Sequence, residues 1–206
     1  MRKLTTTSYA ILGLLALRPW SAYELTKQVR RSLRFCWPRA ETRLYQEPKN
    51  LVEHGLATAT VTASGRRSRT VYAITGEGRT ALRRWLGEPS APPRLESEAL
   101  VRLFFAEHGT KQSLLATLSE LETQAGALRA QAVAQGAEYL ADEAPFPERI
   151  HLLALMGKFT LEHTALVAEW ARWARTEVEG WSGVTGEPPS PEVVAAYREA
   201  RAESPG

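Results

Sequence analysis

The stretch Gly87–Pro93 (GEPSAPP) divides this chain into two parts that require different kinds of fold. Its three prolines and one glycine cannot continue a regular helix or a strand. Before this stretch the apolar runs are short and separated by turn residues, whereas after it they form long periodic segments. We therefore expect a domain over residues 1–86, a linker over residues 87–95, a helical domain over residues 96–182 and a tail over residues 183–206 that can form a short helix.

Charge divides the chain at the same place. Residues 1–86 contain 16 Lys/Arg and 5 Asp/Glu, a balance of +11, and residues 87–206 contain 10 Lys/Arg and 18 Asp/Glu, a balance of −8, which together give the +3 of the whole chain. A basic domain of this size attracts a polyanion, and nucleic acid is the commonest polyanion in a cell. The acidic part cannot share that task, so we expect it to hold the protein together or to sense a ligand.

The first part contains the signals of three short helices with tight connections. Thr7 or Ser8 can cap the first helix, and Ser21 with Glu24 forms a capping box before the second. Gly55 can close the third helix, because glycine tolerates the left-handed backbone at a helix end. Three such helices predict a helix-turn-helix. The expected spans are about residues 8–17, 22–33 and 38–55.

Two β-rich runs, residues 57–63 and 70–75, follow the third helix. The turn between them contains Arg66, Arg67 and Arg69. A hairpin directly after a helix-turn-helix makes a winged helix. We therefore expect a mostly α protein with a small β-hairpin, built as a winged helix-turn-helix followed by a C-terminal helical dimerisation domain.

The second part is predicted to be helical throughout, with helices over residues 96–107, 111–141, 148–181 and, more weakly, 192–203. Apolar residues recur there at spacings of 4 and 3, which is typical of helices that pack side by side. We expect one such stripe to serve dimerisation or effector binding, with ordinary core packing as the alternative. The stripe consists of Leu152, Met156, Phe159, His163, Leu166, Trp170 and Trp173.

The basic part offers side chains that suit a DNA duplex. In a helix-turn-helix the start of the third helix enters the major groove, where its side chains reach base edges or phosphates. Arginines at a hairpin tip suit phosphates or a narrow minor groove. The alternative is a solvated basic face without a partner. The candidate DNA-binding residues are Ser21, Tyr23, Lys27, Arg39, Thr42, Arg43, Tyr45, Gln46, Lys49, Arg66, Arg67 and Arg69.

The sequence lacks the patterns of a metal site or an enzyme. Its four histidines and one cysteine have no metal-ligand spacing, and it has no phosphate-binding glycine loop or nucleophile elbow. We expect no cofactor and no catalytic residue, although an enzyme that uses Cys36 is an alternative. The apolar run Tyr9–Leu17 is too short to cross a bilayer, and a single cysteine is typical of a reducing compartment, so we expect a cytoplasmic protein.

Several motifs occur in an order that resembles the PadR family of bacterial transcriptional regulators. They are YAILGLL at residues 9–15, SAYEL at 21–25, LY at 44–45, LVEHGL at 51–56 and YAITGEG at 72–78. LVRLFF at residues 100–105 is similar to the longer, virulence-activator-like C-terminal domain of that family. The resemblance implies a homodimeric winged-helix repressor that dimerises through C-terminal helices, and some relatives respond to phenolic or other hydrophobic small molecules.

Two positions depart from the family pattern. The family often has Tyr-Pro-x-Leu where this chain has Tyr45-Gln46-Glu47-Pro48, and Thr42 stands where relatives often carry glycine. Pro48 lacks a backbone donor and its ring clashes with the preceding turn, so we expect the third helix to kink or split there.

We therefore predict a DNA-binding transcriptional regulator that represses as a homodimer on a palindromic operator, with two recognition helices ~34 Å apart. Its expected partners are double-stranded DNA, a second copy of the chain and, if one exists, a small hydrophobic or aromatic effector, with no membrane partner. The alternative is a protein-interaction module on a winged-helix scaffold. Salt separates the two, because DNA binding releases counterions and weakens steeply as salt rises.

Overall fold

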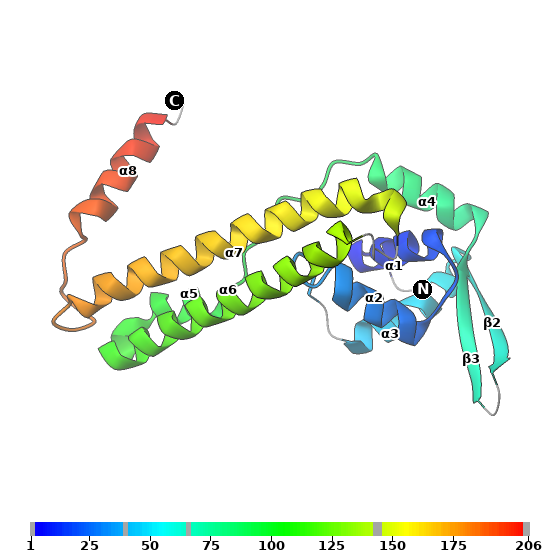
Figure 1. Cartoon of the computed structure of the whole chain (residues 1–206), viewed down its shortest axis with the longest axis horizontal. Helices are drawn as coiled ribbons and strands as arrows, with labels where there is room; N and C mark the ends of the chain where they lie inside the picture. Colours follow the sequence, from blue (N-terminus) through cyan, green and yellow to red (C-terminus); the bar gives the residue numbers. More distant parts are fainter. Residues whose placement is uncertain (1–2, 39–40, 65–66, 142–145, 204–206) are drawn as a thin grey trace. The chain divides into compact units, whose positions relative to one another are not determined.

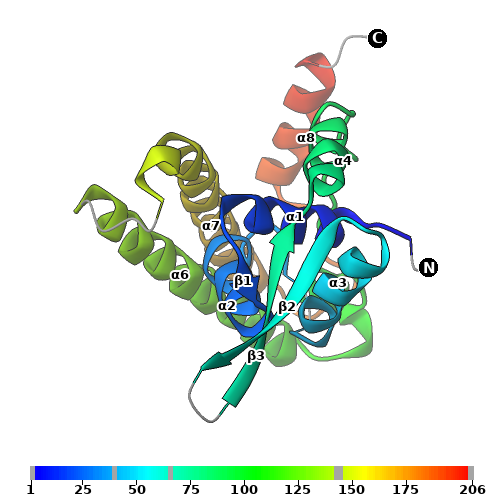
Figure 2. The ribbon, with the colours of Figure 1, turned by 90° about the vertical axis from the view of Figure 1, so that its right-hand side faces the viewer.

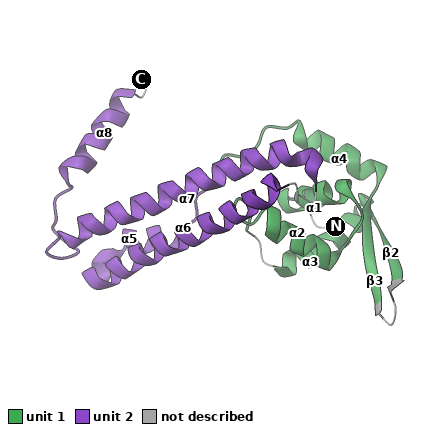
Figure 3. Ribbon diagram, viewed as in Figure 1, with its two compact units in different colours: residues 1–93 green, residues 94–206 purple. Residues whose placement is uncertain are grey.

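The computed structural model of the protein describes residues 3–38, 41–64, 67–141 and 146–203, with the side chains of residues 63, 64 and 67 left out. It divides into two compact units, residues 1–93 and residues 94–206 (Figure 3). Unit 1 contains the helices α1 (Thr6–Leu17), α2 (Ala22–Ser32), α3 (Glu41–Glu53) and α4 (Gly76–Leu86) and the strands β1 (Trp20–Ser21), β2 (Ala57–Ser64) and β3 (Arg67–Ile74) (Figure 1).

The core of unit 1 is built by the first three helices. α1 is apolar on most sides and packs against α3, α4 and β3. Each fully buried Leu or Ile side chain stabilises the fold by about 1.5–3 kcal/mol. The Leu and Ile side chains of unit 1 at 1% exposure or less are Ile11, Leu12 and Leu15 from α1, Leu25 from α2, and Leu44 and Leu51 from α3.

α1 begins earlier than the sequence predicted. Its N-cap is Thr5, whose backbone N–H donates to Ser8 Oγ at 2.8 Å, so the expectation that Thr7 or Ser8 caps the helix was wrong. Both hydroxyls lie inside the helix and contact distant partners, Trp37 and Glu47. The capping box of α2 is confirmed: Glu24 N–H donates to Ser21 Oγ at 3.3 Å, and Ser21 N–H donates to Glu24 Oε2 at 2.8 Å.

α3 is one helix from Glu41 to Glu53 and does not split at Pro48, so that expectation was wrong. Pro48 is fully buried between Leu44 and Leu51, and the packing of this face outweighs the one missing hydrogen bond. At the other end the predicted glycine stop is confirmed. Gly55 has φ of 69°, and Leu56 N–H donates to Leu51 O at 2.9 Å across it.

The three strands form an antiparallel sheet in the order β1-β3-β2. β2 and β3 are joined as a hairpin that projects from the helices of the unit, with Ala57 opposite Ile74 (Figure 2). β1 places Trp20 opposite Tyr72 on the other edge of β3. Beside the sheet, Thr75 caps α4 by accepting from Gly78 N–H at 3.0 Å.

Unit 2 consists of the helices α5 (Glu98–Phe104), η1 (Ala106–His108), α6 (Lys111–Leu140), η2 (Pro147–Arg149), α7 (Ile150–Glu179) and α8 (Pro191–Glu203). α6 and α7 lie side by side in opposite directions (Figure 1). Their packed end contains a cluster of Leu114, Leu118, Ala174 and Val178. The predicted fold class, a winged helix followed by long helices, is confirmed.

None of the described helices combines the length and the apolar character that crossing a bilayer requires. Within the same described ranges, no three His, Cys, Asp or Glu side chains gather in a way that could hold a metal ion.

Candidate nucleic-acid interface

The outer face of α3 presents the polar side chains that the sequence singled out. The inner stripe of Leu44, Glu47, Pro48 and Leu51 points into unit 1. Asn50 is buried beside this stripe, and the positions on the opposite side are turned away from the core because an α-helix has 3.6 residues per turn. All five predicted residues that the structure describes on this helix are exposed, namely Thr42, Arg43, Tyr45, Gln46 and Lys49.

α2 adds two predicted residues but not a third. Tyr23 is 65% exposed, and Lys27, four residues later, is exposed on the same side of the helix. Ser21 differs, because it is 9% exposed and its hydroxyl donates to Glu24 Oε2 at 2.7 Å. The structure thus gives Ser21 a capping role, and we omit it from the candidate interface.

The arginine-rich hairpin is described only in part. Arg69 is exposed on β3, opposite Thr62 of β2. The backbone of Arg67 pairs with that of Ser64, and the structure does not describe the side chain of Arg67. Arg39 and Arg66 also lie outside the described residues. Of the three predicted hairpin arginines, Arg69 is therefore the one whose side chain the structure describes.

Glu24 connects α2 electrostatically with the hairpin. The hydrogen bonds from the backbone and hydroxyl of Ser21 hold the pKa of the Glu24 carboxyl below its usual value, and partial burial opposes them. The positive charges of Arg18 and Arg69 lower the same pKa. The charge of Arg69 is therefore close enough to Glu24 to lower the pKa of its carboxyl. This hairpin cation and the N-terminal cap of α2 thus lie on one side of unit 1.

α2 and α3 are also joined by an ion pair that the sequence reasoning missed. Arg30, in the last turn of α2, donates to Glu41 Oε1 in the first turn of α3. Both side chains are exposed, so the pair adds little stability. It neutralises one cation of α2, which is why we do not count Arg30 among the candidate DNA contacts.

Cys36 does not have the environment of a nucleophile. Cys36 is exposed, but partial desolvation by the atoms around it raises the pKa of its thiol above the usual value. A thiol with a raised pKa carries less of the reactive thiolate at neutral pH. This observation argues against an enzyme that uses Cys36.

Comparison with known proteins identifies the first unit. Residues 11–84 match the model of the transcriptional regulator PadR-like family. The chain carries a PadR-like domain. That model describes a family of transcriptional regulators.

Two curated relatives match over this region. A probable transcriptional regulator of Mycobacterium tuberculosis, Rv1176c, is 34% identical over 87 residues, which are 42% of this chain and 46% of that protein. The negative transcriptional regulator PadR of Bacillus subtilis is 29% identical over 99 residues, which are 47% of this chain and 54% of that protein. The matches thus span about half the length of either relative.

Solved structures extend the likeness of fold to both units. Bacillus subtilis PadR in complex with operator DNA aligns with a TM-score of 0.70 at 20% identity, over 84% of this chain and 99% of that one. The same protein in complex with p-coumaric acid aligns with a TM-score of 0.64 at 20% identity, over 85% and 99%. At this identity the likeness shows the fold alone.

The predicted apolar stripe of α7 lies mostly on the surface of the chain. Phe159 is 63% and Leu166 64% exposed, and the ring of exposed His163 stacks on Phe159 at 5.9 Å between centroids. Leu152 and Met156 are exposed as well. The stripe faces outward because the buried side of α7 is formed mainly by small residues, which are Thr164, Ala171, Ala174 and Val178.

The two tryptophans of the stripe behave differently. Trp170 and Trp173 pack against the cluster of Leu114, Leu118, Ala174 and Val178. Core packing, the alternative reading of the sequence, therefore describes these two residues. The outward part of the stripe stays a candidate for dimerisation.

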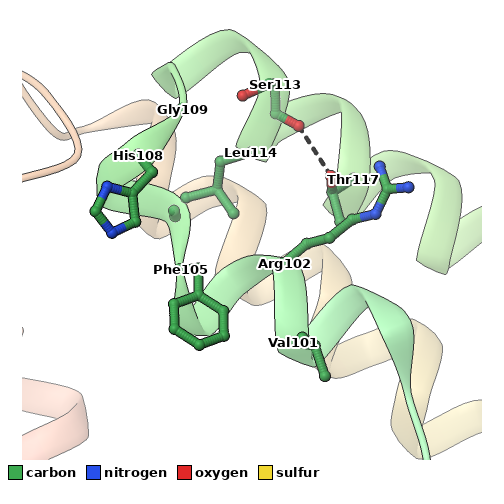
Figure 4. A pocket seen from close by; sticks show the side chains of 9 residues that line it. Val101, Arg102, Phe105, His108, Gly109, Ser113, Leu114 and Thr117 are labelled. Carbon is green, nitrogen blue, oxygen red and sulfur yellow. Dashed lines mark hydrogen bonds between the residues drawn. The ribbon is translucent and has the colours of Figure 1, made fainter.

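A pocket that the sequence did not predict lies between α5, η1 and the start of α6 (Figure 4). It is open to the surface and has a volume of about 370 Å³, with Val101, Phe105 and Leu114 among its lining residues. Arg102 lies at its edge, and its guanidinium donates to Glu98 Oε1 at 2.6 and 3.0 Å. None of the predicted α7 residues lines this pocket.

Proposed function

We propose that this protein is a DNA-binding transcriptional regulator that reads a duplex with the outer face of α3. The observation that carries the proposal is the exposed polar side of α3, together with the exposed cations Lys27 of α2 and Arg69 of β3. It lies in the part of the chain with a balance of +11, and the fold is similar to PadR in complex with operator DNA.

The residues divide by what they can recognise. Arg43 and Gln46 have the side-chain types that bind base edges in the major groove through paired hydrogen bonds. Lys27 and Lys49 are point charges that suit phosphates, which fix register without reading sequence. Arg69 and the neighbouring hairpin arginines suit phosphates or the minor groove.

We further propose that the protein acts as a homodimer. The outward apolar residues of α7, such as Phe159 and Leu166, and the exposed Phe104 of α5 support a second copy as the cover of this surface. A two-fold dimer would place two α3 helices ~34 Å apart and would favour a palindromic operator. The name of the negative regulator PadR, a relative over half its length, supports repression.

A small aromatic or hydrophobic effector is a second element of the proposal. The complex of Bacillus subtilis PadR with p-coumaric acid supports it, as does the open pocket beside Phe105 in unit 2. Such a ligand would shift the dimer toward the spacing and angle of the two α3 helices to which it binds more tightly.

Recovery of genomic fragments on the immobilised protein, followed by binding curves at several salt concentrations, tests the proposal. We expect a few enriched fragments that share a palindrome. Arg43→Ala and Gln46→Ala should remove the enrichment, whereas Arg198→Ala, an exposed arginine of α8, should leave it intact. Failure to retain any duplex in dilute buffer would refute the proposal, and binding that does not weaken with salt would favour the protein-interaction module.

A further inference from the structure

The inner face of α3 contains a carboxylate at a position where the helical period calls for an apolar side chain. Leu44, Glu47, Pro48 and Leu51 follow the spacing 3, 1, 3 that defines one side of a helix. Glu47 is 2% exposed, as deeply buried as its apolar neighbours. A carboxylate in such a place is costly unless it is hydrogen-bonded.

Glu47 is held from α1 and from its own helix. Ser8 of α1, which is completely buried, donates through Oγ to Glu47 Oε1 at 2.5 Å. Asn50, one turn further along α3, donates through Nδ2 to the same oxygen at 3.0 Å. The hydrogen bond from Ser8 joins two helices, so it couples the orientation of α3 to the position of α1.

The neighbouring residue of α1 makes a second connection. Thr7 Oγ1 accepts from the indole N–H of Trp37 at 3.1 Å. Trp37 belongs to the segment that leads into α3, four residues before the helix begins at Glu41. The first turn of α1 thus contacts both the approach to α3 and its middle.

Stability does not account for this polar cluster. Asn50 Oδ1 is buried and has no hydrogen-bond partner among the described residues, and such an atom is usually unfavourable. Replacing a buried polar cluster as a whole by well-packed apolar side chains is often neutral or stabilising, whereas removing one partner alone is costly. A hydrogen bond, however, is directional, whereas contacts between apolar side chains tolerate sliding and rotation.

We propose that Glu47 is a positioning residue that, through Ser8, fixes the rotation of α3 about its axis. The inference rests on the proposed function, because its consequence is the placement of Arg43 and Gln46 on base edges. At the outer radius of a helix, about 5–6 Å, a rotation of roughly 20° moves a side chain by about 2 Å. That displacement breaks hydrogen bonds to bases but leaves long cations within reach of phosphates.

The test compares Glu47→Leu and Glu47→Gln with the unmodified protein. The operator is the duplex that the unmodified protein recovers from genomic fragments, and a scrambled duplex of equal length serves as reference. Glu47→Leu should lower the operator-to-scrambled affinity ratio by ~10-fold or more, since a bidentate base contact contributes that much discrimination. Its affinity for the scrambled duplex should stay close to that of the unmodified protein, whereas its melting temperature should fall, because Ser8 and Asn50 lose a buried acceptor. Glu47→Gln keeps an acceptor for Ser8 and should retain most of the ratio.

Ser8→Ala provides the matched variant, because it removes the donor and leaves α3 unaltered. It should lower the ratio in the same direction, and combined with Glu47→Leu it should add little. A ratio that survives both single substitutions overturns the inference while the proposed function stands. Equal losses on both duplexes together with a lower melting temperature would show a structural role only. An unmodified protein that prefers no duplex refutes the proposed function itself.

Discussion

Replacing Lys49 by alanine should flatten the salt dependence of duplex binding without changing which duplex is preferred. The described interface contains four exposed cations, Lys27, Arg43, Lys49 and Arg69. If each cation neutralises one phosphate charge, Arg43 from within the major groove and the other three on the backbone, a dimer neutralises about eight, and the logarithm of affinity should fall with the logarithm of salt with a slope of about −7.

The substitution removes two of these contacts from a dimer, so the slope should become about −5. Between about 50 and 200 mM salt the unmodified protein should lose ~10⁴-fold in affinity and the variant ~10³-fold. Fluorescence anisotropy with a labelled duplex at five salt concentrations measures both slopes. Operator and scrambled duplex should weaken by the same factor, because phosphate contacts carry no sequence information.

Arg198→Ala is the control, since it removes the same charge from α8 in unit 2. Its slope should equal that of the unmodified protein. The reasoning is refuted if both variants flatten the slope equally, because net charge and not a local contact would then govern binding. It is also refuted if Lys49→Ala leaves the slope unchanged.

Three further outcomes follow from the structure. Gly78→Ala should destabilise unit 1 by about 1–3 kcal/mol in chemical denaturation, because a Cβ there would lie 2.1 Å from a backbone oxygen; unchanged stability would contradict this packing. The pKa of Glu24 is lowered in the folded state, so its contribution to the free energy of unfolding is present above its unfolded pKa and is lost as pH falls through the folded pKa. Glu24→Gln should therefore make the free energy of unfolding less sensitive to acid. An unaltered pH profile of stability would count against the cap. Leu166→Glu should produce monomers in sedimentation analysis, whereas Thr123→Glu, at an exposed position of α6, should not. A dimer that tolerates both substitutions would exclude the α7 stripe as the interface.

Local signals explain what the sequence could predict. The cap at Ser21 and the stop at Gly55 involve partners within a few residues, and each forms in the structure. The outer face of α3 was predictable for a related reason. Once the apolar positions of one helix are known, its period determines which side chains point outward.

Long-range contacts explain what the sequence could not predict. β1 is two residues long and exists because it pairs with β3, about fifty residues later. The N-cap of α1 is Thr5 and not Thr7 or Ser8, whose hydroxyls also bond to residues 30 and 39 positions away. The continuity of α3 through Pro48 likewise reflects packing of its inner side, which no local rule contains.

The stripe of α7 shows a third limit. Spacing identified an apolar side of the helix, but it could not say whether α6 would lie against that side. In the structure α6 takes the side with Thr164, Ala171 and Ala174, where small residues allow two helices to approach closely. Leu152, Met156, Phe159 and Leu166 are left exposed on the other side, whereas Trp170 and Trp173 pack against the cluster.

The bond between Ser8 and Glu47 has a consequence for the divergence of related sequences. It makes two positions 39 residues apart depend on each other, so a change at one alters which residues are acceptable at the other. Homologues that keep the acid should keep a hydroxyl at the matching place in the first helix. If α3 reads DNA as proposed, Arg43 and Gln46 on its outward face should instead vary with the operator.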